Sequence, residues 1–204
     1  SGVFKDEWIK YGEEPQYGSY YIAVDLAGFE EVARVTGTKK KLDESAIAIV
    51  KVTDDGKWFV DKIDHGRWDV KETAVKILTA IRDYEPLAVG IERGALKNAV
   101  LPYLSDLMRK NNTYAHIHDL THGNKKKADR IVWGLQGRFE HGRIILNKDE
   151  EWDEFIDQLL MFPTPQVHDD LIDALAYIDQ LSITSYIDDD DDTEEEPLDI
   201  ISGY

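Results

Sequence analysis

The chain has 204 residues and no cysteine, which excludes disulfides and thiolate zinc sites and is typical of a single domain with one hydrophobic core. It has no apolar run of about eighteen residues and no signal-peptide pattern, so we expect a cytoplasmic protein that does not enter a membrane. A formal net charge of -17 argues against a nucleic-acid partner unless the acidic residues are concentrated away from the binding surface. The start Ser1-Gly2, without a methionine, is typical of a cleaved tag and indicates a domain taken from a longer protein.

The acidic residues are concentrated at the C-terminus. Residues 188–204, DDDDDTEEEPLDIISGY, contain nine acidic residues and no basic one, so we expect this segment to be disordered and separate from the fold. The two densest basic clusters are Lys39–Lys41 and the segment 124–130, NKKKADR. A nucleic-acid role therefore stays open if these clusters flank a functional site.

The first half of the chain predicts three antiparallel strands. Residues 19–26, SYYIAVDL, are apolar and rich in aromatic and β-branched side chains, which is typical of a buried strand. After the polar stretch 29–44, strands are expected at 45–53 and 57–65. The turn Asp54–Gly56 joins these two strands.

The middle of the chain alternates between helix and strand. Residues 69–85 carry apolar side chains at helical spacing, and Pro86 ends that helix. The segment 86–94, PLAVGIERG, predicts a short strand buried on both faces. A helix at 96–110 and a strand at 114–119 complete a β-α-β-α-β series, which implies right-handed crossovers and largely parallel strands.

The last part of the chain is predicted to be mainly helical. Helices are expected at 127–141, 150–161 and 168–181, with a short strand at 143–147. The last helix carries three acidic residues near its start, in the sequence HDDLIDALAY. Like charges a few ångströms apart repel by roughly 1 kcal/mol in water and by more in a drier site. The cluster therefore needs an explanation.

Two explanations account for the cluster. Solvent exposure or a helix N-cap explains Asp169, Asp170 and Asp173 without any function, because Asp is favoured at helix starts. A divalent-metal site explains them if acidic residues from elsewhere lie close by. Asp25 and Glu92, each near the end of a predicted strand, are the candidates.

Five motifs follow one another along the chain: IAVDLAG around Asp25, DESAIAIV at 43–50, VGIERG around Glu92, KKKADRIVWGLQGRFEHGRI at 125–144, and HDDLIDALAY at 168–177. Together they resemble the ribonuclease-H-like nucleases, and in detail the C-terminal nuclease domain of the large terminases, the DNA-packaging motors of tailed phages. The resemblance implies an α/β fold with a mixed sheet, in which three antiparallel strands precede parallel strands and helices flank the sheet.

The resemblance also divides the chain. It implies a linker at residues 1–18, a nuclease domain at 19–186 and an acidic tail at 187–204. No Walker A pattern, G-x-x-x-x-G-K-[ST], occurs in the sequence, so this chain cannot hydrolyse ATP by that route. The ATPase of the motor is expected on a preceding N-terminal domain.

The implied activity is an endonuclease that cuts double-stranded viral concatemer DNA during genome packaging. Two Mg²⁺ or Mn²⁺ ions about 4 Å apart stabilise the attacking and leaving oxygens in such a reaction, and carboxylates are their preferred ligands. The expected metal ligands are Asp25, Glu92, Asp169, Asp170 and Asp173. Of these, Asp25, Glu92 and Asp170 are expected to be catalytic.

The sequence leaves open which acids of the last helix bind metal. Asp170 and Asp173 match the D-x-x-D pattern of related resolvases, whereas Asp169 and Asp170 match the adjacent carboxylates of some terminase nucleases. His168 is interpreted as a cap or surface residue, with a role at the leaving group as the alternative.

The basic segment is expected to bind DNA. Lys125, Lys126, Lys127 and Arg130 form either a solvated helix start or a site for DNA phosphates, as the resemblance implies. The implied partners are double-stranded DNA and, in the full-length protein, an N-terminal ATPase domain, the portal and the small terminase subunit. No membrane partner is expected, and the location is the host cytoplasm, transiently at the procapsid portal.

Two other readings compete with this one. The first is a Holliday-junction resolvase or another ribonuclease-H-like nuclease, and a resolvase is expected to dimerise and to prefer branched DNA. The second is a non-catalytic acidic interaction domain. Dependence on a divalent metal separates this last reading from both enzymes.

Overall fold

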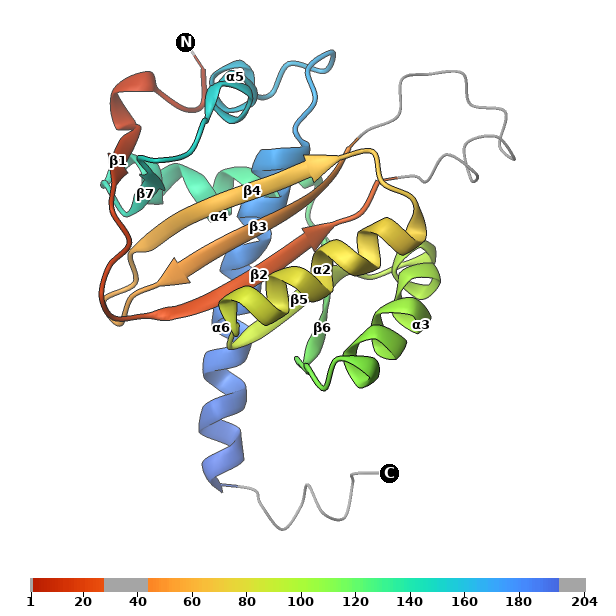
Figure 1. Cartoon of the computed structure of the whole chain (residues 1–204). Coiled ribbons are helices and arrows are strands. Elements are labelled where there is room, and N and C mark those ends of the chain that lie inside the picture. Colours follow the sequence, from red (N-terminus) through yellow and green to blue (C-terminus); the bar gives the residue numbers. More distant parts are fainter. Residues whose placement is uncertain (1, 28–43, 195–204) are drawn as a thin grey trace.

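The computed structural model describes residues 2–27 and 44–194, with the backbone alone for residues 184–194. In this part of the chain, seven strands form one mixed sheet in the order β1-β7-β4-β3-β2-β5-β6, with helices on both faces (Figure 1). The ribonuclease-H-like α/β class expected from the sequence is confirmed. The basic cluster Lys39–Lys41 and residues 195–204 of the acidic tail lie outside the described residues.

The three predicted antiparallel strands pair in chain order. They are β2 (Ser19–Asp25), β3 (Ser45–Val52) and β4 (Trp58–Gly66). The register places Ile22 of β2 opposite Ile49 of β3. Both residues are buried, in agreement with the almost unbroken apolar sequence of these strands.

The remaining strands add to this unit in parallel. On one side, β5 (Ala88–Glu92) pairs with β2, and β6 (Ile117–Leu120) pairs with β5. On the other side, β7 (Ile144–Asn147) pairs with β4, and β1 (Lys10–Gly12) pairs with β7. The strand β2 therefore lies where the antiparallel part of the sheet meets the parallel part.

At both ends of the described chain, secondary structure extends into segments that the sequence predicts to lie outside the nuclease domain. Although residues 1–18 are expected to be a linker, the 3-10 turn η1 (Asp6–Trp8) leads into β1 of the sheet, and Phe4 is buried in the core. The last helix, α6 (Asp170–Glu194), continues past residue 187, where the acidic tail is expected to begin. The expected domain boundaries stay predictions beside these observations.

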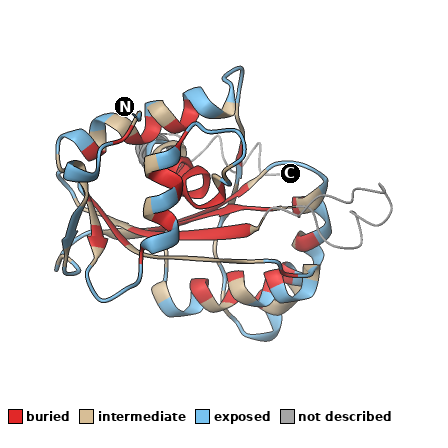
Figure 2. Cartoon of the chain, turned by 90° about the horizontal axis from the view of Figure 1, so that it is seen from above, coloured by how far each residue is buried: buried red, intermediate tan, exposed pale blue. Residues whose placement is uncertain are grey.

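Helices form a layer on each face of the sheet. The first layer contains α2 (Val70–Tyr84) and α3 (Ala95–Lys110), and the second contains α4 (Lys127–Glu140), α5 (Asp153–Met161) and α6. Figure 2 shows the sheet between the two layers, with the buried residues of the helices turned toward it. The helices α2 to α5 begin and end within a few residues of the predicted positions, whereas α6, predicted to end at residue 181, continues to Glu194.

The strand β2 is buried on both of its faces. Ile22 and Val24 pack in the apolar cluster beneath α2 and α3, whereas Ala23 belongs to the cluster beneath α6. Ala46 and Ala48 of β3 lie in the same cluster as Ala23. These small side chains allow α6 to pack closely over the middle of the sheet, and its position decides where its acidic residues lie.

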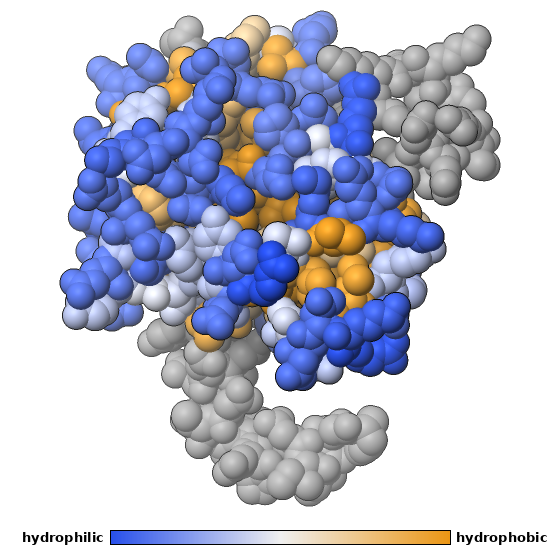
Figure 3. Space-filling view, in the orientation of Figure 1, coloured by the Kyte–Doolittle hydropathy of each residue, from blue (hydrophilic) through white to orange (hydrophobic). Residues whose placement is uncertain are grey.

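The outer surface is mainly polar. The face seen in Figure 3 is hydrophilic over most of its area, with small separate apolar patches. Within residues 2–27 and 44–194, no helix combines the length and the apolar composition needed to cross a bilayer.

Helices α4 and α6 approach each other at Gly134. A Cβ atom added there would lie 3.2 Å from the carbonyl oxygen of Ala176, so Gly134→Val is expected to lower the free energy of unfolding by roughly 1–3 kcal/mol. Gly137→Val on the same helix is the matched control, because an added Cβ there meets nothing within 4 Å. Urea unfolding measures both variants, and equal losses of stability would contradict the close approach.

Candidate metal centre

Two acidic residues end neighbouring strands. Asp25 is the last residue of β2 and Glu92 is the last residue of β5. The two strands run parallel, with Val24 beside Ile91 in the register. Because side chains alternate along a strand, the residues that follow this pair both fall on the opposite face, which α6 covers. The strand pairing therefore places two carboxylates side by side beneath α6.

The first turn of α6 adds two further carboxylates. Asp25, Glu92 and Asp173 each offer one oxygen, and these oxygens lie within 4.8 Å of one another. Asp173 is 1% exposed and Asp170 is 5% exposed. Asp170 accepts a hydrogen bond of 3.0 Å from the backbone N–H of Glu44, at the start of β3. Three elements, β2, β5 and α6, thus supply the carboxylates of one acidic site.

The three acids of the HDDLIDALAY motif therefore have different positions. Asp173 joins Asp25 and Glu92, and Asp170 lies beside them. Asp169 precedes α6, and its Oδ1 lies 2.8 Å from Nζ of Lys127. His168 is partly exposed, with Nδ1 3.9 Å from Oδ2 of Asp170. The geometry favours the D-x-x-D pair for the shared site, and the assignment of metal ligands stays a prediction.

Two basic residues of α4 extend into the acidic site. Arg130 is 8% exposed, forms an ion pair with Asp173 and lies with its guanidinium carbon 3.7 Å from the ring centroid of Tyr177. Nζ of Lys127 lies 3.3 Å from Oδ2 of Asp173, in addition to its contact with Asp169. These cations offset part of the negative charge.

The four basic residues that are expected to bind DNA differ in how far they are buried. Lys125 and Lys126 are exposed at the start of α4, where phosphates can approach. Lys127 is half-buried and Arg130 is buried among the carboxylates. The i, i+3 spacing of Lys127 and Arg130 turns both toward α6, which explains the difference. Contact of all four with DNA stays a prediction.

Glu92 has two neighbours that the sequence analysis did not single out. The hydroxyl of Tyr177 donates to Oε2 of Glu92 at 2.5 Å, and Nε2 of His122 lies 3.4 Å from the same oxygen. Nδ1 of His122 accepts from Nε of Arg130 at 3.2 Å. The sequence pattern could have identified both residues. Tyr177 follows Asp173 at i+4 on one helix face, and His122 follows β6, whose end lies beside the end of β5.

Burial and like charge dominate the electrostatics of the site. Burial, together with the charges of Glu92 and Asp170, raises the pKa of Asp25 to about 8. Burial opposes the charged form of Lys127, but the hydrogen bond to Asp169 and the nearby carboxylates raise its pKa overall. Burial and the charge of Arg130 lower the pKa of His122, which favours the neutral ring. Lys127 thus stays cationic beside an acid that resists ionisation.

This donor set fits a hard divalent cation. Carboxylate oxygens are the ligands that Mg²⁺ and Mn²⁺ prefer. Lys127 and Arg130 lower the pKa of Asp25, but burial first, and then the charges of Glu92 and Asp170, outweigh them and disfavour its ionised form. A divalent cation held by these residues would favour the ionised form of Asp25.

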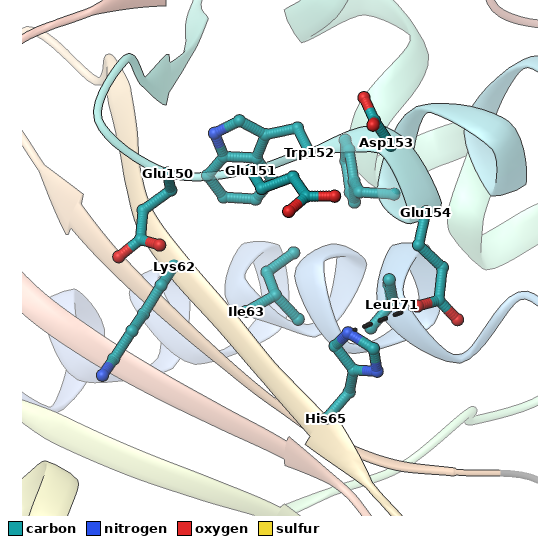
Figure 4. A pocket seen from close by; sticks show the side chains of 10 residues that line it. Lys62, Ile63, His65, Glu150, Glu151, Trp152, Asp153, Glu154 and Leu171 are labelled. Carbon is teal, nitrogen blue, oxygen red and sulfur yellow. Dashed lines mark ion pairs between the residues drawn. The ribbon is translucent and has the colours of Figure 1, made fainter.

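A second group of acids surrounds His65 of β4, beside a cavity of about 260 Å³ (Figure 4). Nδ1 of His65 lies 2.6 Å from Oε2 of Glu44, and Nε2 lies 3.5 Å from Oε2 of Glu154 on α5. Glu44 also donates its backbone N–H to Asp170. These contacts connect β4, α5 and the segment just before β3. They help to hold Glu44, whose backbone N–H binds Asp170 of the acidic site.

Asp25 is expected to make stability depend on pH when metal is absent. Its pKa is about 8 in the folded state and about 3.9 in the unfolded state, so only the folded state holds the proton between these values. The resulting stability is complete below about pH 4 and is lost as the pH rises through about 8. Asp25→Asn has no ionisable group at this position and does not lose this stability. The difference between its thermal midpoint and that of the wild type should therefore grow as the pH rises.

Thermal unfolding in EDTA from about pH 5 to about pH 8 measures this effect. Each 1 kcal/mol corresponds to roughly 2–4 °C in the midpoint for a chain of this size. A difference between wild type and Asp25→Asn that is constant over the pH range would contradict the raised pKa.

The fold and the acidic site together define a ribonuclease-H-like nuclease domain. The family model described as Terminase RNaseH-like domain matches residues 22–179. The chain belongs to this terminase family. No curated protein matches it.

Solved structures resemble the chain in fold. The nuclease domain of the large terminase subunit gp2 of bacterial virus Sf6 is 10% identical, with a TM-score of 0.62, 88% of this chain covered and 98% of that one. The large terminase nuclease of thermophilic phage G20c is 13% identical, with a TM-score of 0.55 and coverage of 84% and 92%. The yeast mitochondrial Holliday junction resolvase Ydc2 is 13% identical, with a TM-score of 0.51 and coverage of 84% and 78%.

Proposed function

We propose that this domain is a divalent-metal-dependent endonuclease that cuts double-stranded viral concatemer DNA during genome packaging. The observation that carries the proposal is the convergence of Asp25, Glu92 and Asp173, whose oxygens lie within 4.8 Å of one another. Two of these three carboxylates are buried, which is costly unless a cation binds there.

Asp25, Glu92, Asp170 and Asp173 are proposed to hold two Mg²⁺ or Mn²⁺ ions, with Asp169 as a further ligand. When bound, such ions lower the pKa of the attacking water and stabilise charge on the attacking and leaving oxygens of the phosphodiester. Structures of similar nucleases support this proposal, because the phage G20c domain has been solved with bound magnesium and with bound zinc, and a K428A mutant of Sf6 gp2c with calcium.

The other side chains of the site act by orientation and charge. Tyr177 and His122 hold Oε2 of Glu92 in place. Arg130 holds Asp173, and Lys127 supplies positive charge beside the site for the phosphate. The exposed Lys125 and Lys126 are proposed to bind the DNA backbone, which makes binding sensitive to salt.

The proposed setting is the packaging motor of a tailed phage. In the full-length protein the partners are an N-terminal ATPase domain, the portal and the small terminase subunit. The protein then acts in the host cytoplasm and transiently at the procapsid portal.

Plasmid cleavage tests this function. The wild-type chain is expected to nick and linearise supercoiled DNA with Mg²⁺ or Mn²⁺ and to leave it intact with EDTA. Asp25→Asn and Asp173→Asn are each expected to lower the rate by at least roughly 100-fold, because even residues that only orient metal ligands cost about 10–100-fold. Asp83→Asn is the control, since this exposed acid lies on α2, across the sheet. Cleavage in EDTA, or full activity of Asp25→Asn, would refute the proposal.

Tyr177→Phe tests the orientation of Glu92. The variant keeps the ring against Arg130 but loses the hydroxyl that donates to Glu92. We expect roughly 10–100-fold weaker metal binding or slower cleavage. A titration of Mg²⁺ in the cleavage assay separates the two effects, and an unchanged metal dependence and rate would show that this hydrogen bond is dispensable.

The similarity to Ydc2 keeps a Holliday-junction resolvase as the second candidate. A four-way junction and a linear duplex of the same sequence distinguish the two functions. A terminase nuclease is expected to cut the duplex with little sequence preference, whereas a resolvase is expected to dimerise and to cut the junction preferentially.

A further inference from the structure

Trp133 is the most exposed large apolar side chain in the described part of the chain. It is 74% exposed on α4, one turn after Arg130. Nζ of Lys125 lies 4.7 Å from the centroid of its ring. Scattered exposed apolar residues are common on protein surfaces, so the exposure alone indicates nothing. The surroundings of this indole are what distinguish it.

The indole lines a cavity that adjoins the acidic site. The cavity has a volume of about 240 Å³, and Trp133, Lys125 and Asn124 line it together with His122, Arg130 and Tyr177. His122 and Tyr177 are the two side chains that contact Glu92. One wall of the cavity is therefore also the outer wall of the proposed metal centre.

The size and the side chains of the cavity fit one planar ring with polar edges, with a phosphate group nearby. Its volume is below the roughly 300–1,000 Å³ typical of drug-sized ligands, which suits a single small ring system. The indole offers a flat aromatic face, and Lys125 offers a charge that a phosphate can take. Asp179, the acid in the wall, is paired with Arg138 at 2.7 Å, so its charge is already offset.

We propose that this cavity binds an unpaired nucleobase of the DNA substrate, stacked on Trp133, while Lys125 binds a neighbouring phosphate. The inference rests on the proposed nuclease function and adds a base-binding subsite beside its metal centre. Stacking on an aromatic ring is tolerant of sequence, because every base has a π-face. Local opening of the duplex next to the cut then follows the initial binding of paired DNA.

Tryptophan fluorescence provides a direct test, with short oligothymidylate as the probe and EDTA present to prevent cleavage. Trp58, Trp68 and Trp152 are at most 9% exposed, and the partly exposed Trp8 lies in η1, near the opposite edge of the sheet. The quenching that Trp133→Phe removes is therefore the part that reports a base stacked on Trp133. Trp133→Phe is expected to lose that quenching while it keeps most of the affinity measured by anisotropy of labelled oligothymidylate.

Trp133→Ala is expected to bind oligothymidylate roughly 5- to 100-fold more weakly. Its affinity for a blunt duplex of the same length should change little, because no base is unpaired there. Tyr17→Ala is the matched control, since Tyr17 is equally exposed but precedes β2 at the end of the strand far from Asp25.

The outcomes separate the subsite from the nuclease function. Equal affinity of wild type and Trp133→Ala for oligothymidylate, in a domain that still cleaves plasmid DNA, would overturn the subsite alone. An equal loss for oligothymidylate and duplex would also overturn it, because Trp133 would then contact the backbone. A wild-type domain that neither binds nor cleaves DNA would overturn both proposals.

Discussion

The mutual repulsion of buried carboxylates is the constraint on which the rest of the site depends. Asp25 and Glu92 are adjacent because β2 and β5 pair in parallel, and Asp173 is added because α6 packs over the small side chains of the sheet. Such a group is stable only if positive charge is near. Arg130 and Lys127 provide part of it from α4. The start of α6 provides more, since the N-terminal end of a helix carries partial positive charge.

The sequence predicts six of the seven strands in the described part of the chain and the helices α2 to α6, and it places Asp25 and Glu92 at strand ends. Alternation and apolar runs identify β2 and β5, and a strand end is where an acid such as Asp25 or Glu92 becomes available to a ligand. Most predicted boundaries lie close to those observed because turns, Pro86 and glycines interrupt the patterns. The exception is the end of α6, where no Pro or Gly stops the helix before Glu194. The short edge strand β1 was missed, since its three residues have no apolar pattern and depend on β7 as a partner.

Which acid of α6 joins the site was not predictable from sequence. Whether Asp169 or Asp173 accompanies Asp170 depends on how α6 is rotated about its axis over the sheet, and that rotation is set by packing against Ala23 and its neighbours. The burial of Arg130 was hidden for a similar reason. A run of basic residues is usually solvated, and only the close approach of α4 and α6 at Gly134 turns Arg130 inward.

The ion pairs of Lys127 and Arg130 have a thermodynamic consequence for the proposed function. A cation that enters the site must compete with the two basic side chains for Asp173, so its net affinity is the difference between two sets of contacts. A DNA phosphate that offers Lys127 a new partner relieves this competition. By reciprocity, the bound cation must then raise the affinity for DNA by the same factor. In the proposed nuclease, the resting ion pairs would thus couple the two ligands, so that each would bind weakly until the other is present.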